Sequence, residues 1–199
     1  MTRTATRTRA TKETSIEIVL DLDGAGEARV DTGLPFFDHM VAQLGKHGGF
    51  DLTVRAEGDL AVDAHHTVED VGIALGECVR EALGDKAGVR RFASIDLPLD
   101  EALVSVALDL SGRPYLHYDV DPGGGAEAYP LGSPPFDPQL AEEFWRALVT
   151  SAGVTLHVRM ISGRNTHHIL EASFKAVARA LRDAVRVEGK GVPSTKGTL

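Results

Sequence analysis

The sequence predicts an α+β fold formed by internal duplication of a half-domain of antiparallel strands plus helices. The first observation is the pattern His-His-x-x-Glu, which occurs at 65–69 and again at 167–171, each time followed by apolar residues at helical spacing. The two copies align without a gap, as in the match of Ala74 with Ala176. Short β-branched segments separated by turn residues precede each copy. Strands joined by hairpins, with helices on one side, favour α+β over a doubly wound parallel sheet.

The first half is predicted to contain three strands and two helices. Residues 16–20 alternate and are β-branched, and the Asp- and Gly-rich residues 23–26 supply a turn, so we expect a hairpin. Leu52, Val54 and Ala56 share one face of a later strand. The elements in order are a strand at 16–20, its hairpin partner at 28–32, a helix at 36–46, a strand at 51–57 and the repeat helix at 65–83. Residues 1–12 are rich in Thr and Arg and are expected to form a frayed N-terminus.

The second half is predicted to repeat this plan. A turn at 98–101 separates its first two strands, and a tight turn at 111–114 sends the chain back into a third. Gly and Pro make 121–138 the one long loop. The elements in order are strands at 94–97, 103–110 and 115–120, a helix at 139–152, a strand at 154–161 and the second repeat helix at 167–185.

Composition limits the classes of protein to consider. With 199 residues, 43% of them hydrophobic, we expect one domain over 1–199 with homologous halves at about 9–88 and 89–187 and a flexible tail at 188–199. The net charge of −8 argues against nucleic acid or an anionic membrane as a partner. No run is long enough for a membrane span. The lone Cys78 indicates a reducing compartment, and we expect a cytoplasmic location.

The repeated pattern carries the chemistry. Neighbours on a helix point about 100° apart, so His65 and His66 cannot easily bind one ion together. His65 and Glu69, one turn apart, can reach a single metal, whereas His66 must serve a second ion or a second subunit. The copy at 167–171 behaves in the same way. Paired histidines are often surface residues or helix caps, but their duplication makes metal binding the better interpretation.

Eight side chains are candidate metal ligands, four for each of two ions, which leaves octahedral positions open for water or substrate. Nitrogen-rich sites without thiolates suit Mn, Fe, Co or Zn better than Ca or Mg. We expect His39 and His157 to occupy matching places in the two halves. The eight candidates are His39, His65, His66, Glu69, His157, His167, His168 and Glu171.

A cationic set forms a second candidate site. Arg91 precedes a strand, Arg113 lies in a Ser-Gly-Arg-Pro turn, and Lys196 is flanked by hydroxyls and glycine. These residues suit a phosphate group, although each alone is more often a solvated surface charge. Glu13 and Asp100, at the edges of strands, are candidates for proton transfer.

The motifs together resemble a known family. They are RATKET at 9–14, FDHM at 37–40, HHTVED at 65–70, DLSGRP at 109–114, RNTHH at 164–168 and PSTKG at 193–197. In these segments, which span nearly the whole chain, the sequence resembles imidazoleglycerol-phosphate dehydratase of histidine biosynthesis. The resemblance implies two sheets flanking packed helices. It also implies homo-oligomers in which trimers assemble into a 24-mer, with two Mn²⁺ ions per active site and ligands from different subunits.

The implied reaction removes water from D-erythro-imidazole glycerol phosphate, a small phosphorylated imidazole substrate, to give imidazole acetol phosphate. The resemblance implies a metal-bound imidazolate and a diazafulvene-like intermediate, with the metals acting as Lewis acids and as a template. Glu13 would transfer a proton and contact the substrate, and the catalytic set would include His65, Glu69, His167 and Glu171. Phosphate would be bound by Arg91, Arg113, Ser194 and Lys196.

Two other classes of protein would use the same residues. A dinuclear metal-dependent hydrolase would need the same ligands but a bridging water as nucleophile. A metal-storing or metal-bridged assembly protein would leave no open coordination positions, and its cationic cluster would lie far from the metals.

Overall fold

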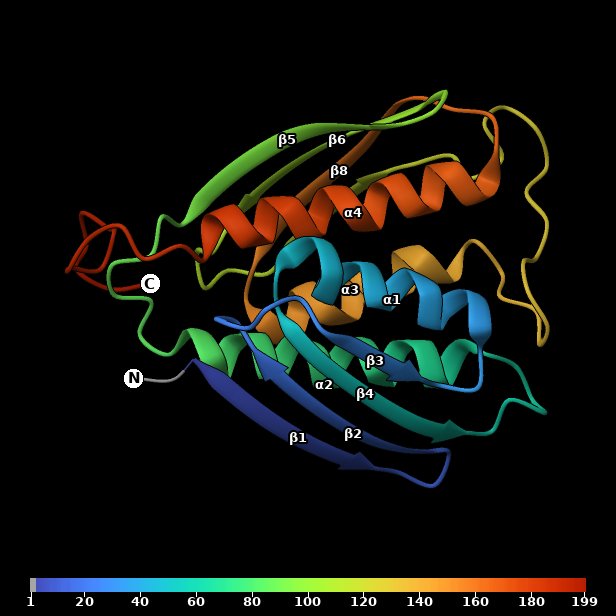
Figure 1. Cartoon of the computed structure of the whole chain (residues 1–199), viewed down its shortest axis with the longest axis horizontal. Helices are drawn as coiled ribbons and strands as arrows, with labels where there is room; N and C mark the ends of the chain where they lie inside the picture. Colours follow the sequence, from blue (N-terminus) through green and yellow to red (C-terminus); the bar gives the residue numbers. More distant parts are fainter. Residues whose placement is uncertain (1–2) are drawn as a thin grey trace.

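Residues 3–199, which the computed structural model describes, form two four-stranded sheets with a layer of four helices between them (Figure 1). The first half contains β1 (Thr4–Ala10), β2 (Thr14–Asp21), β3 (Ala28–Asp31), α1 (Pro35–Gly48), β4 (Asp51–Gly58) and α2 (His65–Leu83). The second half contains β5 (Phe92–Leu99), β6 (Ala102–Asp109), β7 (Tyr115–Asp119), α3 (Leu140–Ala152), β8 (Thr155–Ser162) and α4 (Thr166–Ala184).

The two sheets share one topology. Their strand orders are β1-β2-β4-β3 and β5-β6-β8-β7, and in each sheet the first three strands are antiparallel while the last pairs in parallel. The predicted α+β fold with internal duplication is therefore confirmed. Strand β3 pairs in parallel with β4, and β7 pairs in parallel with β8. The chain therefore reaches the far edge of each sheet before it enters α1 or α3.

The predicted hairpin between 16–20 and 28–32 is wrong. The hairpin partner of β2 is β1, within the segment expected to be frayed, and β3 pairs with β4 instead. Polar residues occupy both faces of β1, so its sequence has no apolar alternation to mark it as a strand. Arg7 and Arg9 point inward and pair with acidic residues of α2. Residues 1 and 2 of the predicted frayed segment lie outside the described residues.

The expected return of the chain after the turn at 111–114 is also wrong. We expected 115–120 to pair back with the preceding strand. Instead, β7 pairs in parallel with β8, which follows α3 and is separated from β7 by 35 residues. A tight turn before a β-branched or aromatic segment predicts a hairpin locally, and only the tertiary fold places the strand at the far edge of the sheet.

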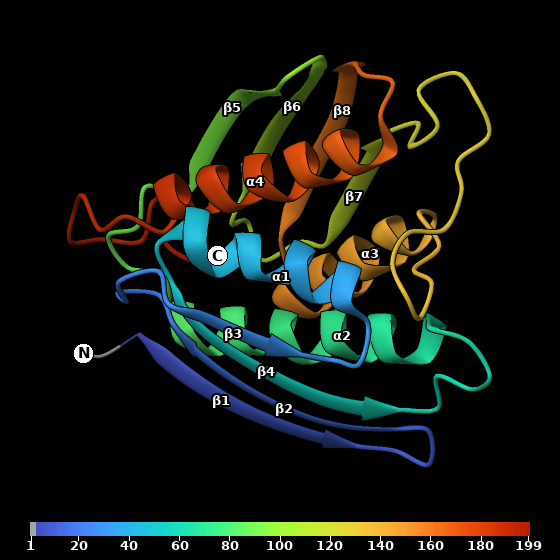
Figure 2. The same ribbon diagram turned by 45° about the vertical axis from the view of Figure 1, so that its right-hand side comes forward.

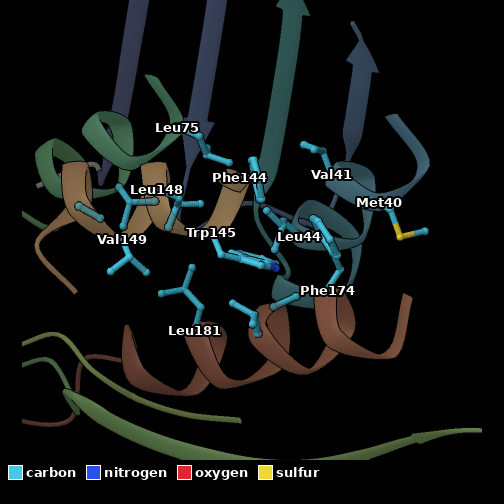
Figure 3. Close-up of a cluster of buried hydrophobic side chains, with 14 of the residues drawn as sticks. Met40, Val41, Leu44, Leu75, Phe144, Trp145, Leu148, Val149, Phe174 and Leu181 are labelled. Carbon is cyan, nitrogen blue, oxygen red and sulfur yellow. The ribbon is translucent and has the colours of Figure 1, made fainter. Parts of the chain in front are cut away.

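The two halves share one hydrophobic core. Helix α1 packs on α4 and α2 packs on α3, so each half contributes to both helix pairs. Trp145 lies at the centre, with its ring centroid 4.6 Å from that of Phe174 and 4.9 Å from that of Phe144, and all three are fully buried (Figure 3). None of the helices within residues 3–199 is long and apolar enough to cross a membrane.

Two glycines allow α2 and α3 to approach closely. A Cβ atom at Gly72 would lie 2.7 Å from the carbonyl oxygen of Phe144, and one at Gly76 would lie 2.5 Å from that of Leu148. Both obstacles are backbone atoms, which cannot rotate away. The glycines therefore set the distance between the helices, and with it the place of the first His-His pair.

We predict that Gly76→Ala destabilises the protein by about 1–3 kcal/mol, because the added methyl group forces α2 from α3. The midpoint temperature of thermal unfolding should fall by several degrees, whereas Arg80→Ala on the exposed face of α2 should change it little. Helix propensity alone predicts the opposite sign, so a more stable Gly76→Ala variant would refute the packing argument.

Candidate active site

Two imidazoles and a carboxylate from α1 and α4 converge where α4 begins. Nε2 of His167 lies 2.8 Å from Oε2 of Glu171, and Nε2 of His39 lies 3.4 Å from the same oxygen. Each of the three residues offers a ligand atom within 4.8 Å of the other two. His167 and Glu171 are one turn apart, as their spacing predicts. Two imidazole nitrogens and one carboxylate oxygen suit a divalent transition metal.

The Glu171 carboxylate is kept ionised by its neighbours. Lys175 lies 2.6 Å from its second oxygen, Oε1, on the same helix. Burial acts to raise the pKa of Glu171, but hydrogen bonds from Lys175 and His167, with the nearby charge of His39, outweigh it and lower the pKa to about 2. An ionised carboxylate is the form that binds a metal.

Neighbouring side chains also orient the two imidazoles. The side-chain amide of Gln43 donates to the backbone carbonyl of His39 at 3.0 Å and lies 3.3 Å from Nδ1 of its ring. The Phe36 ring stands edge-on to that of His167, with centroids 5.3 Å apart. These contacts hold both rings toward Glu171.

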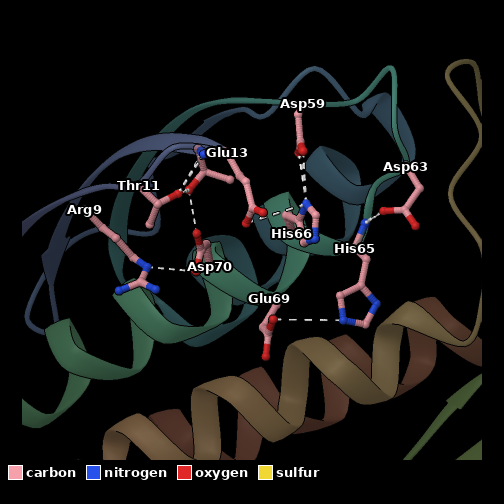
Figure 4. A network of polar contacts seen from close by, with 10 residues as sticks. Arg9, Thr11, Glu13, Asp59, Asp63, His65, His66, Glu69 and Asp70 are labelled. Atoms are coloured by element: carbon pink, nitrogen blue, oxygen red, sulfur yellow. Dashed lines mark hydrogen bonds and ion pairs between the residues drawn. The ribbon is translucent and has the colours of Figure 1, made fainter.

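The first His-His pair diverges as its spacing requires. Nε2 of His65 lies 3.9 Å from Oε2 of Glu69, while His66 faces the turns that precede α2 (Figure 4). Nδ1 of His66 lies 3.1 Å from Asp59 and 3.8 Å from Glu13. The hydrogen bond with Asp59 raises the pKa of His66 above its ordinary value. Asp59 was missed in the sequence, where it resembles an ordinary loop residue after a strand.

His168 has an equivalent partner in the second half. Its Nδ1 lies 2.8 Å from Glu101 and its Nε2 lies 3.8 Å from Asp100. Glu101 also accepts backbone hydrogen bonds from Arg164 and Asn165. The hydrogen bond from His168, aided by these amides, lowers the pKa of Glu101 to about 2, and the same contact raises the pKa of His168. Glu101 was missed, although its position in a hairpin turn matches that of Glu13.

His157 lies apart from these clusters. It points outward from β8, where its ring centroid is 5.4 Å from that of His117 and 5.6 Å from that of Tyr115. The expectation that His39 and His157 occupy matching places is wrong, because His39 lies on a helix and His157 on a strand. A ligand role for His157 stays a prediction, and it would require a second subunit.

The predicted phosphate-binding residues do come together. Arg91, Arg113, Ser194 and Lys196 line one pocket near the C-terminus. Arg91 donates to both oxygens of Asp109, at 2.6 and 3.1 Å, and to the carbonyl oxygen of Pro193 at 2.7 Å. Arg113 is 70% exposed and lies 3.9 Å from Asp109. Glu13, predicted to contact the same substrate, lies beside His66 instead.

The starts of α2 and α4, which carry the two His-His pairs, lie at the opposite end of the molecule from the C-terminal segment that lines the cationic pocket (Figures 1 and 2). The backbone N–H of Arg91 donates to the carbonyl of Ala184, the last residue of α4, whereas His167 is near its first. At 1.5 Å per residue the helix separates them by about 25 Å. Within one protomer the cationic pocket is therefore far from His39, His167 and Glu171. His157 lies nearer to it, two residues from Thr155, whose hydroxyl donates to the carbonyl oxygen of Arg113 at 3.1 Å.

Comparisons with known proteins agree on one family. A family model described as imidazoleglycerol-phosphate dehydratase matches residues 32–181. The chain is 57% identical over 202 residues to the imidazoleglycerol-phosphate dehydratase of Parafrankia sp. (strain EAN1pec), covering 100% of both chains. It is 58% identical over 199 residues to that of Acidothermus cellulolyticus, covering 99% of this chain and 93% of the relative.

Two solved structures are similar along nearly the whole chain. The imidazoleglycerol-phosphate dehydratase of Staphylococcus aureus subsp. aureus N315 has a TM-score of 0.81 and 35% identity, and the match covers 92% of this chain and 99% of that one. The Pyrococcus furiosus protein, in complex with (S)-C348, has a TM-score of 0.81 and 37% identity, with 97% and 100% covered.

We predict a pH-dependent contribution of Glu101 to stability in the metal-free protein. The lowered pKa of Glu101 stabilises the fold above the ordinary Glu pKa of 4.5, an effect lost as the pH falls toward about 2. The raised pKa of His168 stabilises it below 6.5, an effect lost as the pH rises through the raised value. Glu101→Gln should therefore lower the thermal unfolding midpoint more at pH 5.5 than at pH 9.

Glu142→Gln is the matched control. Glu142 pairs with Arg146, whose charge persists at both pH values, so its loss should have similar effects at pH 5.5 and pH 9. Equal losses at the two pH values in Glu101→Gln would show that His168 is not its partner in solution.

Proposed function

The chain belongs to the imidazoleglycerol-phosphate dehydratase family, hydro-lyases of histidine biosynthesis, and from this we propose its substrate, metals and residue roles. The proposed reaction removes water from D-erythro-imidazole glycerol phosphate to give imidazole acetol phosphate. The observation that carries the proposal is the convergence of His39, His167 and Glu171 in a chain of this family.

We propose two Mn²⁺ ions per active site. The donor atoms of His39, His167 and Glu171 fit one ion, because they are close together, partly exposed and include an ionised carboxylate. His65 and Glu69 supply part of a second site. The remaining proposed ligands are His66, His157 and His168, which diverge from these groups within one protomer. A bound divalent metal would act as a Lewis acid on the imidazole ring of the substrate and fix its orientation.

The cationic pocket is the proposed phosphate site. Arg91 is held by Asp109 and Pro193, so its guanidinium is fixed before a ligand arrives. Arg113 is exposed and can turn toward a phosphate, and Ser194 and Lys196 add donors from the C-terminal segment. Arg91 is thus fixed, whereas Arg113 and Lys196 can adapt to the ligand. This arrangement suits the phosphate group of a substrate whose imidazole ring is bound at another place.

Because α4 separates the two ends by about 25 Å, we propose a homo-oligomer with active sites shared between subunits. A three-carbon chain between ring and phosphate is far too short to span that distance. The outward position of His157 on β8 also fits a role in the site of a neighbouring copy. The proposed assembly is a 24-mer built from trimers, as the family resemblance implies.

Glu13 is the proposed proton-transfer residue. The reaction breaks a C–H bond and a C–O bond on adjacent carbons and releases water, so a base must accept the carbon-bound proton. The Glu13 carboxylate is 53% exposed, and its ion-pair partner His66 is 3.8 Å away, longer than a hydrogen bond. It is therefore available to a substrate bound beside His66.

A dinuclear hydrolase is the alternative that the same ligands permit. It would release inorganic phosphate from a phosphomonoester, whereas the proposed dehydratase keeps the ester intact. Family membership favours the dehydratase, and activity is best measured as formation of imidazole acetol phosphate with inorganic phosphate followed in parallel.

We predict that Glu13→Gln binds Mn²⁺ and substrate as the wild type does but loses turnover by about 10²–10⁴-fold, because the amide cannot accept the proton. Metal titration, substrate titration and kcat measure the three properties separately. Full activity in this variant would remove Glu13 from the chemistry.

We predict that two inactive variants restore activity when they assemble together. Glu171→Gln impairs the histidine end and Arg113→Met the phosphate end, so random assembly leaves up to about a quarter of shared sites intact. Co-expressed Glu171→Gln and His39→Ala serve as the control, because both changes affect the same end. Failure of the first pair to exceed the control would show that one protomer supplies a whole site.

A further inference from the structure

Two hairpin turns present carboxylates to the His-His pairs, but they are held in different ways. In the β5–β6 turn the Glu101 carboxylate itself fastens the turn, since it accepts hydrogen bonds from Arg164, Asn165 and His168. In the β1–β2 turn the Glu13 carboxylate makes only the longer contact with His66. The turn that carries Glu13 is held by a backbone hydrogen bond from Asp59 to the Glu13 carbonyl at 3.1 Å and by a network of side chains.

The side-chain network begins at Asp70, on the second turn of α2. Its side chain is 10% exposed and receives hydrogen bonds from Nε of Arg9 at 2.8 Å and from the hydroxyl of Thr14 at 2.5 Å (Figure 4). The equivalent residue of α4 is Ala172, so the second half has no such anchor. This anchor, the Asp70 carboxylate with its contacts to Arg9 and Thr14, is therefore present only in the half whose hairpin carboxylate, Glu13, does not itself hold the turn.

The hydrogen bonds extend from Asp70 to Glu13 in one direction. An ionised carboxylate can only accept, so the Thr14 hydroxyl must donate to Asp70 and accept from the Thr11 hydroxyl 3.1 Å away. The Thr11 oxygen then accepts the backbone N–H groups of Glu13 and Thr14 at 3.1 and 3.0 Å. The charge of Asp70 thus orients two hydroxyls and fixes the backbone of Glu13.

We propose that Asp70, through Thr14 and Thr11, is the positioning residue that holds Glu13 beside His66 for proton transfer. This inference rests on the role proposed above for Glu13. Within residues 3–199 the hydrogen-bond and ion-pair partners of the Asp70 carboxylate are Arg9 and Thr14, neither of which is a proposed metal ligand. A displacement of the catalytic group by about 1 Å can lower a rate by about 10²-fold, so the anchor matters to turnover rather than to binding.

The chain provides a matched control for a merely structural role. Arg7 also lies on the inner face of β1 and pairs with α2, through Glu77 at 3.4 Å and Glu81 at 2.7 Å. Arg7→Met removes an ion pair between the same strand and the same helix without touching the turn. Any effect that comes only from loosening β1 should therefore appear in Arg7→Met as well.

The experiment compares Asp70→Asn, Thr14→Val, Thr14→Ser and Arg7→Met in the assembled, Mn²⁺-loaded protein. Asp70→Asn removes the charge, Thr14→Val removes the hydroxyl at nearly constant volume, and Thr14→Ser keeps the hydroxyl. We expect kcat to fall by about tenfold or more in the first two, with KM and Mn²⁺ affinity within about twofold of wild type. Thr14→Ser and Arg7→Met should keep kcat within about twofold.

Hydrogen–deuterium exchange of the turn at 11–14 gives a second measurement that does not depend on activity. Its amides should exchange faster in Asp70→Asn and Thr14→Val than in Arg7→Met or Thr14→Ser. Equal exchange in all four variants, or equal kcat in Asp70→Asn and Arg7→Met, would overturn the proposal. Faster exchange together with full activity in Glu13→Gln would instead leave the anchor intact and refute the proposed role of Glu13.

Discussion

A helix can direct only residues one turn apart toward the same point, and this constraint governs the arrangement of the two adjacent His-His pairs, at 65–66 and 167–168. Within each pair the ring planes are nearly perpendicular, at 84° for His65 and His66 and 85° for His167 and His168. Each ring therefore meets a different set of neighbours. A complete site must combine helix starts with turns, other helices and, in our proposal, other subunits.

The two halves of the duplicated fold each contain one His-His pair at the start of a helix. They differ in the acidic residues that contact the second histidine of each pair. In the first half Asp59, from the segment between strand and helix, pairs with His66, whereas in the second half Glu101, from a hairpin turn, pairs with His168. Only the first half also has an acidic residue at the Asp70 position. In our proposal the first hairpin carboxylate, Glu13, is thereby free for proton transfer, while its counterpart Glu101 holds the backbone in place.

Sequence periodicity was sufficient for contacts within an element and insufficient for contacts between elements. The pairing of His167 with Glu171 follows from helix geometry alone. The four phosphate-binding candidates come from different segments of the chain, and their shared pocket was expected from the family resemblance rather than from periodicity. The partners Asp59 and Glu101 lie on loops, so only the fold decides which ring they meet. Strand β1 was missed because two of its three inward positions are arginines, whose partners on α2 are distant in the sequence. The parallel β3 and β7 were taken for hairpin strands because local turn signals do not specify a partner.

In our proposal, the length of α4 links catalysis to assembly. A helix of 19 residues is rigid over about 28 Å, and no rotation of side chains brings its two ends to one small molecule. If the ends of different copies form each site, the folded protomer alone is incomplete, and activity depends on protomer concentration as any association equilibrium does. Selection for turnover would then act on the surfaces between copies as strongly as on the metal ligands, which gives a reason for histidine on the outer face of β8.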